Sequence, residues 1–294
     1  MRVSGFTFVR NGVQFDYPFE ESLRSLAPLV DELVVNVGKG LDATMERVAR
    51  VAADFPGKFQ VFESVWDEKL REEGLVLSQQ TNLALARCSG DWGVYLQADE
   101  VLHEDDYTAL RQSLAESLSD PRVDGLLFDY VHFYGDFQVI NRNPSAYRRE
   151  VRAIRLGRAI ESWKDAQGFR RRRTDGSMEK LRVKHSGARV FHYGWVRPPE
   201  VMKEKTLAMD TLYHADGGGT GDNHRYKRIY GLERFSGSHP KVMATRVKEK
   251  SWRVDLLRAP LVFKAGDVRK VLARLVESLT GWLPGEYKNY RRID

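Results

Sequence analysis

The stretch Gln79–Glu100, QQTNLALARCSGDWGVYLQADE, decides the fold of this chain. It begins inside a predicted helix, Leu75–Arg87, where apolar residues recur at helical spacing before a polar Ser-Gly-Asp turn. The apolar run Trp92–Leu96 then predicts a buried strand, and two adjacent carboxylates, Asp99 and Glu100, follow its end. A helix that leads through a turn into a buried strand indicates an α/β fold.

The same alternation extends over the whole N-terminal half. Runs rich in β-branched and aromatic residues predict strands at 3–9, 32–37 and 59–63. Helices are predicted at Tyr17–Leu26, with Asp16 as N-cap, and at Ala43–Asp54 and 104–118. A strand at 123–133, at an edge or antiparallel, and an apolar run at 137–140 complete this half.

Strands that alternate with helices at this spacing predict a mostly parallel sheet with helices on both sides. Ligands bind such sheets at the carboxyl ends of the strands, which singles out the loops 10–12, 38–42 and 97–100. After about residue 140 the segments become shorter and more basic. Strands are predicted there at 151–156, 181–184 and 188–193, and helices at 199–214 and 267–279.

The composition limits the class of protein. A hydrophobic fraction of 42% supports a sizeable core, and the single cysteine, Cys88, excludes an intrachain disulfide. No signal peptide and no membrane-spanning run is recognisable, so a cytoplasmic location is expected. The net charge of +6 fits nucleic acid, an anionic membrane surface, phosphorylated small molecules, or a merely solvated basic surface.

The two acids after the strand have two interpretations. Asp99 and Glu100 concentrate negative charge, and Mg²⁺ or Mn²⁺ often takes one or two carboxylates together with substrate phosphates. The alternative is a turn whose acids cap the helix that begins near Glu104.

Three stretches carry a resemblance to a known family. Phe6–Gly12 (FTFVRNG), Val30–Thr44 (VDELVVNVGKGLDAT) and Gln79–Glu100 together resemble the family 2 glycosyltransferases of the GT-A fold. The resemblance covers about the first 135 residues well and the remainder loosely. It implies a hexosyltransferase-like enzyme with a nucleoside-diphosphate-sugar donor and Mn²⁺ or Mg²⁺, of the kind that builds bacterial polysaccharide or lipopolysaccharide. The acceptor would be a glycan or a lipid-linked molecule.

The resemblance also divides the chain and assigns roles in donor binding. It implies a nucleotide-sugar-binding core at 1–135, an acceptor and catalytic part of the same domain at 136–215, and a flexible loop with a basic helical extension at 216–294. Donor-binding residues would be Phe8, Arg10 and Asn11 at the nucleoside, Asp42 beside base and ribose, and Asn82, Gln97 and Asp99.

The metal site departs from the family pattern. Asp99 matches the last acid of the DxD motif that holds the metal, but Gln97 replaces the first acid, and Asn36 replaces an Asp after the second strand. The Gln97 amide can bind ribose or a metal-bound water but adds no charge. Either the metal affinity is lower than in the family, or Glu100 compensates as a metal ligand.

The second half should supply a base and an acceptor site. Asp165 is the candidate general base, with Glu161 in reserve, although Asp165 also fits a surface turn. His192, at the end of a predicted strand, would bind the metal or the diphosphate, or be a hydrogen-bonded buried histidine. Trp163 and Trp195 would stack on a sugar or pack in the core.

The basic segments are open to two interpretations as well. Arg170 and Arg171, in a run of four arginines, would bind a phosphate of the donor or of a lipid-diphosphate acceptor, or form a solvated loop. The glycine loop 216–222 would be a lid or a linker. The amphipathic segment 267–279 agrees with loose attachment to an anionic membrane, or is a packed core helix.

Three other functions compete. A nucleotidyltransferase needs a glycine-rich loop with a lysine near the first strand, and Arg10-Asn11-Gly12 does not supply one. A nucleic-acid-binding module leaves the acids at 99–100 unexplained, so no nucleic acid is expected. An inactive sugar-nucleotide binder stays open because of Gln97.

Overall fold

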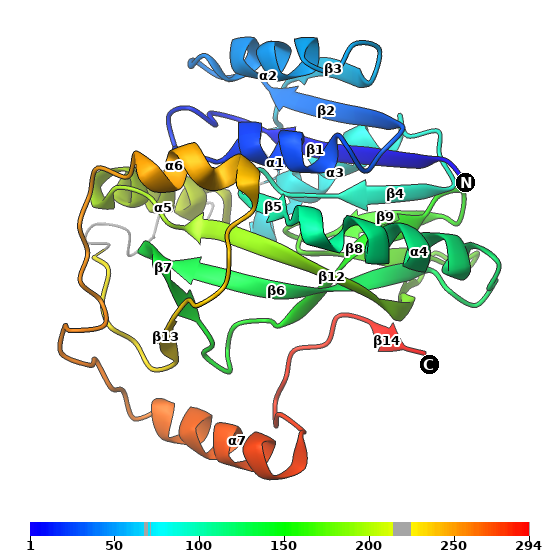
Figure 1. The fold of residues 1–294 in the computed structure, drawn as a ribbon. Coiled ribbons are helices and arrows are strands. Elements are labelled where there is room, and N and C mark those ends of the chain that lie inside the picture. The colour runs from blue at the N-terminus through cyan, green and yellow to red at the C-terminus, as the bar shows by residue number, and fades with distance from the viewer. Residues whose placement is uncertain (68–69, 71, 214–224, 294) are drawn as a thin grey trace.

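Figure 1 shows the computed structural model, which describes residues 1–67, 70, 72–213 and 225–293 around one large sheet. The N-terminal half forms the predicted alternation. Its elements are β1 (Val3–Val9), α1 (Phe19–Leu26), β2 (Glu32–Gly38), α2 (Thr44–Ala53), β3 (Phe59–Ser64), α3 (Leu75–Leu85) and β4 (Trp92–Tyr95). The strands β4, β1, β2 and β3 lie side by side in that order, and their pairings are all parallel.

The strands from residue 100 onward extend this sheet and are partly antiparallel. They are β5 (Glu100–Leu102), β6 (Gly125–Tyr134), β7 (Asp136–Asn141), β8 (Arg149–Arg155), β12 (Arg182–Trp195), β13 (Leu232–Arg234) and β14 (Arg291–Arg292). From β4 the sheet continues through β8, β6 and β7 to β13, while β12 pairs with β5, β6 and β14.

A small separate sheet and four further helices complete the described part of the chain. The small sheet holds β9 (Ile160–Trp163), β10 (Gly168–Arg172) and β11 (Met178–Lys180). The helices are α4 (Tyr107–Leu118), α5 (Pro199–Tyr213), α6 (Ala244–Lys248) and α7 (Asp267–Thr280), besides short 3-10 turns.

Alternate residues of β2 show why helices cover both faces of the sheet. Leu33 and Val35 belong to a cluster with side chains of α1, α2 and α4. Val34, which lies between them, packs with Phe6 and with Ala84 of α3 on the other face. A strand that is apolar at every position needs a cover on each side. The predicted α/β class, with helices on both faces and a less regular C-terminal part, is therefore confirmed.

One local prediction is confirmed in part and two are wrong. β6 does not lie at an edge of the sheet, but it is antiparallel to β7 and β8, as the alternative form of the prediction has it, and parallel to β12. The two strands predicted at 181–193 are one strand, β12, whose register shifts between His185 and Arg189. Asp16 is not the N-cap of α1, because the helix begins after Pro18. The Asp16 carboxylate instead accepts a hydrogen bond from Arg246 at 2.6 Å.

One of the two interpretations of the C-terminal helix, that it packs in the core, is wrong. α7 is no core helix, because Leu272, Leu275 and Leu279 are exposed on it. Among the described helices, none is long and apolar enough to cross a membrane. The glycine loop 216–222 and the end of the helix predicted to reach residue 214 lie outside the described residues.

A buried carboxyl on β8 makes the stability depend on pH. Glu150 is fully buried, and of its two oxygens Oε1 accepts from the Val151 N–H while Oε2 has no hydrogen bond within the described residues. Burial raises the pKa of Glu150 from its ordinary 4.5 to about 7, although Arg152 and Arg170 oppose the shift. Between pH 4.5 and about 7, Glu150 is therefore protonated in the native protein but ionised in the unfolded chain.

This shift has a definite sign. The contribution of Glu150 to stability should fall as pH rises from 4.5 to about 7, because over this range its carboxyl ionises in the unfolded chain and not in the native state. We expect Glu150→Gln to raise the free energy of unfolding by about 2–3 kcal/mol at pH 8 and to change it little at pH 4.5. Urea unfolding at both pH values measures this, with exposed Glu63→Gln as control. An equal effect at both pH values contradicts the prediction.

Candidate active site

A cavity of about 310 Å³ opens where β1 and β4 end, the place that the sequence predicts for a ligand. Elements from both halves of the chain line it. The predicted site residues in its lining are Phe8, Arg10, Gln97, Asp99, Asp165, His192 and Trp195. The structure thus brings together seven residues that the sequence singles out across almost 190 positions.

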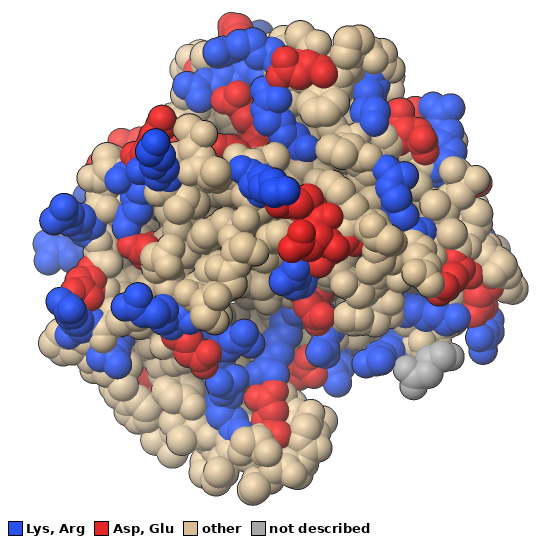
Figure 2. Space-filling view, viewed as in Figure 1, with Lys and Arg blue, Asp and Glu red and all other residues tan. Residues whose placement is uncertain are grey.

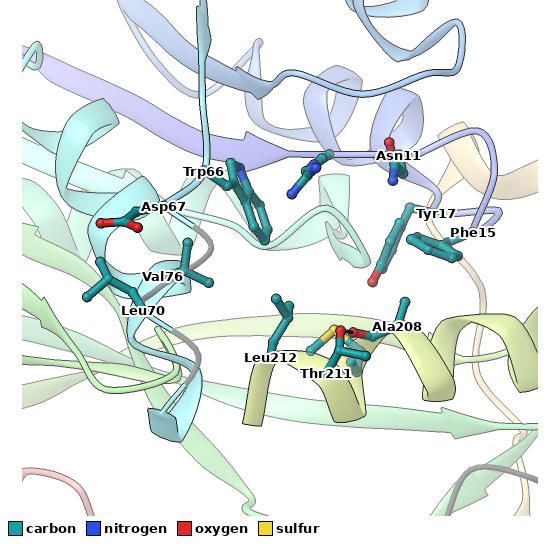
Figure 3. A pocket seen from close by; sticks show the side chains of 12 residues that line it. Asn11, Phe15, Tyr17, Trp66, Asp67, Leu70, Val76, Ala208, Thr211 and Leu212 are labelled. Carbon is teal, nitrogen blue, oxygen red and sulfur yellow. Dashed lines mark hydrogen bonds between the residues drawn. The ribbon is translucent and has the colours of Figure 1, made fainter. Parts of the chain in front are cut away.

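A second cavity, of about 260 Å³, continues the first, since Arg10, Tyr17, Trp66 and Met209 line both. Figure 3 shows its walls: Trp66 and Tyr17 lie along one side, and residues of α5 such as Leu212 lie along the other. Two aromatic rings and an apolar helix face suit a flat ring such as a nucleoside base.

The predicted nucleoside residues lie at this aromatic end. The Arg10 guanidinium lies 5.1 Å from the centre of the Trp66 ring, and its Nε donates to the Lys39 carbonyl at 3.0 Å. Phe8 meets the same indole edge-on at 5.9 Å. Asn11 lines the cavity, and its buried Oδ1 has no hydrogen bond within the described residues. That oxygen lies against Gly40 and points away from the cavity, so Asn11 lines the cavity with the nitrogen side of its amide (Figure 3).

Two residues that the family resemblance places at the donor have other partners. The Asp42 carboxylate accepts from the backbone N–H groups of Val13, Gln14 and Thr44 at 2.8–3.2 Å and from the Thr44 hydroxyl at 2.6 Å. It therefore fixes the loop after β1 against the start of α2. Asn82 bonds the backbone of Ser162, with its Oδ1 accepting at 2.8 Å. Neither residue lines the two cavities.

Asp99 and His192 face each other in the cavity without a hydrogen bond. The distance from His192 Nε2 to Asp99 Oδ1 is 3.8 Å. A Cβ on Gly194 would lie 2.5 Å from that Nε2 and 2.9 Å from Asp99 Oδ2, so only glycine leaves this space open. Two ligand atoms that each bind one cation at about 2.1 Å lie about 3–4 Å apart. Oxygen and imidazole donors at this spacing fit a divalent cation.

A hydrogen-bond chain fixes which nitrogen of His192 carries the proton. His132 Nε2 lies 2.6 Å from the Tyr147 carbonyl, which only accepts, so this nitrogen carries a hydrogen. Burial lowers the pKa of His132 to about 3, and His192 adds to the effect, so His132 is neutral and its Nδ1 accepts. His192 Nδ1 therefore donates across the 2.9 Å contact. Burial also lowers the pKa of His192, which leaves a lone pair on Nε2 that faces Asp99.

Two cations surround the Asp99 carboxylate. Lys205 Nζ donates to Asp99 Oδ2 at 3.3 Å and to the Gly194 carbonyl at 2.9 Å. Arg197 is fully buried, and its Nε and Nη2 have no hydrogen bond within the described residues. Burial alone would raise the pKa of Asp99, but Lys205, His192 and Arg197 outweigh it and lower that pKa to about 2. Asp99 is thus ionised at every working pH.

Glu100 is not a metal ligand, and the prediction that it compensates for Gln97 is wrong. Its carboxylate accepts two hydrogen bonds from Arg152 at 2.8 Å, and neither side chain is exposed. The Tyr130 hydroxyl donates to the same group at 2.7 Å. The acids also do not cap the next helix: the 3-10 turn at Glu104–Asp106 is capped by the His103 ring. Asp99 and Glu100 therefore point into different surroundings.

Asp165 and Gln97 both line the first cavity. Asp165 occupies the turn between β9 and β10, and it also lines a further opening of about 500 Å³ together with Tyr147 and Tyr287. The Gln97 amide donates to the Ala166 carbonyl at 3.3 Å and so holds this turn against β4. Trp195 is 42% exposed and lines the cavity.

The side chains of the arginine run have partners within the protein, which does not support the predicted phosphate site. Arg171 pairs with Asp124 and Glu179, and Arg170 donates to the backbone of Phe169 and Asn289. Trp163 lies under the Arg170 guanidinium at 5.9 Å, outside the cavities described. The reserve base Glu161 pairs with Arg172. Since β10 sits in the small sheet, its arginines meet the acids of neighbouring strands.

Sequence reasoning missed several residues of the site. These residues lie in loops, in α5 and in the middle of β6, outside the quoted motifs: Trp66, Tyr17, Tyr147, Lys205 and His132. His132 gives one usable signal, because it is a polar residue between Val131 and Phe133 in a predicted strand. Lys205 gives none, since a lysine on an exposed-looking helix is common.

Comparison with known proteins gives similarity to solved structures only. No protein-family model matches the chain, and no curated protein matches it. Residues 1–349 of TarS from S. aureus are 12% identical, with 72% of this chain and 65% of that chain covered and a TM-score of 0.39. The mannosyltransferase PcManGT from Pyrobaculum calidifontis, in complex with GDP-Man and Mn²⁺, is 23% identical, with 45% and 36% covered and a TM-score of 0.34.

A third similar structure is glucosyl-3-phosphoglycerate synthase from Mycobacterium tuberculosis in complex with Mn²⁺, UDP and phosphoglyceric acid. It is 19% identical, with 45% of this chain and 43% of that chain covered and a TM-score of 0.29. The chain thus spans 65% of the TarS fragment and less than half of the other two proteins.

Proposed function

We propose that this protein is a glycosyltransferase that moves a sugar from a nucleoside diphosphate to an acceptor hydroxyl. The observation that carries the proposal is the pair of donors on Asp99 and His192, 3.8 Å apart at the end of β4. The Asp165 carboxylate lines the same cavity as the pair, and the aromatic cavity proposed for a base continues that cavity. A base, a diphosphate with its cation, and a sugar need three connected sites of this kind.

Asp99 and His192 are the residues that would hold Mn²⁺ or Mg²⁺. They supply one oxygen and one nitrogen, and the phosphates of the donor and water would complete the coordination. When bound, the cation supplies Lewis-acid stabilisation of the leaving diphosphate. Lys205 adds a positive charge beside Asp99, at the position where the diphosphate gains negative charge.

The chain's own residues account for the other steps. Trp66, Arg10 and Asn11 bind the base, and Trp195 presents its indole to the sugar. Asp165 accepts the proton of the attacking acceptor hydroxyl, which approaches through the opening beside Tyr287. In a single displacement the bond from the acceptor oxygen to the anomeric carbon forms as the bond to the diphosphate breaks, and the anomeric configuration inverts. We place the chain with family 2 and propose a glycan or lipid-linked acceptor for surface-glycan synthesis.

His132 acts on the cation site through His192. We expect His132→Phe to lower Mn²⁺ affinity by about 10–100-fold, because nothing then accepts from His192 Nδ1 and its ring loses its fixed tautomer. His132→Asn retains an acceptor near the place of Nδ1 and should keep most of the affinity. Electron paramagnetic resonance of free Mn²⁺ measures both. Unchanged Mn²⁺ binding by the Phe variant contradicts the prediction.

The proposed function is tested by ligand-dependent thermal stability. We expect one class of nucleoside diphosphate, with its sugar nucleotides, to raise the melting temperature more in the presence of Mn²⁺ than in its absence. Trp66→Ala should remove this stabilisation, whereas Trp163→Ala, outside the cavities, should not. If no nucleoside diphosphate stabilises the protein with or without Mn²⁺, the function is wrong. Stabilisation without donor hydrolysis identifies an inactive sugar-nucleotide binder instead.

A further inference from the structure

The helix α7 is amphipathic, but its polar face is the one that meets the protein. Glu277 accepts two hydrogen bonds from Arg148, and Arg274 donates to Glu233 at 3.1 Å. In an ordinary surface helix the apolar face packs inward and the polar face meets water. Here the contacts to the body of the protein are ion pairs, so the orientation is reversed.

The apolar face of α7 is exposed instead. Val268, Leu272, Leu275 and Leu279 recur at helical spacing on one side and are 51–78% exposed, and Trp282 follows the helix at 59%. Most of the exposed large hydrophobic side chains in the described residues lie between positions 261 and 287. Contiguous exposed apolar surface of this kind marks an interaction surface.

The charges around this apolar stripe are basic. Arg269 on the helix and Lys264 just before it are exposed, and Arg291 is exposed in β14, further along the same segment. The acids of the same segment face inward: Asp267 is buried, and Glu277 and Glu286 form ion pairs. Figure 2 shows the lobe that α7 forms below the sheet as largely uncharged, with charged side chains gathered where it meets the body.

We infer that α7 and its flanks (residues 261–292) dock this protein on the surface of an anionic lipid bilayer. An apolar helix face with Trp at its end and Lys and Arg at its sides matches a helix that lies in the membrane interface. Charge decides between this occupant and a second copy of the chain. Two copies that met through α7 would bring the same basic flanks together, whereas anionic headgroups neutralise them.

The docking surface on α7 lies close in the chain to the opening that Asp165 lines. Tyr287, seven residues after the end of α7, lines the opening of about 500 Å³ that Asp165 also lines. A bilayer beneath α7 therefore lies near the entrance through which an acceptor reaches Asp165. This last step rests on the proposed glycosyl transfer, but the docking itself does not.

Vesicle flotation tests the inference with the full chain. We expect the protein to float with phosphatidylcholine vesicles that contain about 30 mol% phosphatidylglycerol, and not with phosphatidylcholine alone. Salt at about 0.5 M should weaken the binding, because it screens the basic flanks. The variant Leu275→Gln with Leu279→Gln should lower the partition coefficient by about tenfold or more, since two side chains lose their apolar environment.

Controls separate docking from folding and from donor binding. Leu83→Gln, on α3, changes a leucine of similar exposure and should bind vesicles like the parent protein. The α7 variant should keep the melting temperature and the stabilisation by nucleoside diphosphate. No binding to anionic vesicles, or equal binding by the α7 variant, overturns the inference. A parent protein that is dimeric without lipid, and monomeric in the α7 variant, shows that a second copy occupies the surface and overturns it too.

Discussion

Replacing Asp99 with asparagine is expected to lower the rate of sugar transfer by about a thousandfold or more while the fold persists. The change removes one of two cation ligands and the charge that positions the cation. Several kcal/mol of transition-state stabilisation depend on that charge, and about 4 kcal/mol corresponds to a thousandfold in rate. Initial rates of transfer, measured with the donor identified by thermal stabilisation, test this expectation.

Lost stability must be separated from lost chemistry in this variant. Asp99→Asn also leaves the Lys205 ammonium buried without a carboxylate, so some loss of stability is expected. Adding Lys205→Met should restore stability but not transfer. Asp54→Asn, an exposed carboxylate in a surface ion pair, serves as the control and should change neither. An Asp99→Asn protein that transfers sugar at the parent rate removes the basis of the proposed function.

Replacing Glu100 with glutamine is expected to lower the free energy of unfolding by about 3–5 kcal/mol. Glu100 and Arg152 are both fully buried, and in the variant the guanidinium loses its counter-charge and one of its two acceptors at position 100, although the carbonyls of Gln167 and Val151 remain. An unpaired buried charge costs more than the pair contributes, so the loss is large for a single change. Urea unfolding followed by circular dichroism measures it.

The double variant Glu100→Gln with Arg152→Met tests whether the unpaired charge of Arg152 causes the loss of stability. Removing the cation as well should restore most of the stability, because no unpaired buried charge remains. Mn²⁺ affinity of the folded Glu100→Gln protein should stay within about twofold of the parent value, since Glu100 lies outside the cation site. A loss below 1 kcal/mol in the single variant, or a large fall in Mn²⁺ affinity, contradicts this role.

The neighbouring residues Asp99 and Glu100 show how far sequence reasoning reaches at a site. Both follow the same strand, and the pattern could not tell them apart. The backbone turn sends Asp99 into the cavity, while Glu100 begins β5 and meets Arg152, which lies 52 positions later. The partner of a charged side chain depends on which distant strands pair, and no local pattern records that pairing.

The arginine run and His132 also have partners that are decided by the pairing of distant strands. Four consecutive arginines suggested a phosphate site, but β10 and β11 pair in register and bring Glu179 to Arg171 and Arg173. His132 had no neighbours in sequence that suggested a role. Its function as the acceptor for His192 exists only because β6 and β12 run side by side in parallel.

The sequence by itself determined the alternation of strands and helices, the burial of β2 on both faces, and the edge of the sheet at which a ligand site lies. These features follow from local periodicity, which the residues carry wherever they fold. Only the tertiary structure decided which acid faces the cavity, which histidine fixes another, and which way α7 presents its apolar face. An amphipathic pattern states that two faces differ, but what each face meets depends on chain segments that fold against it from elsewhere.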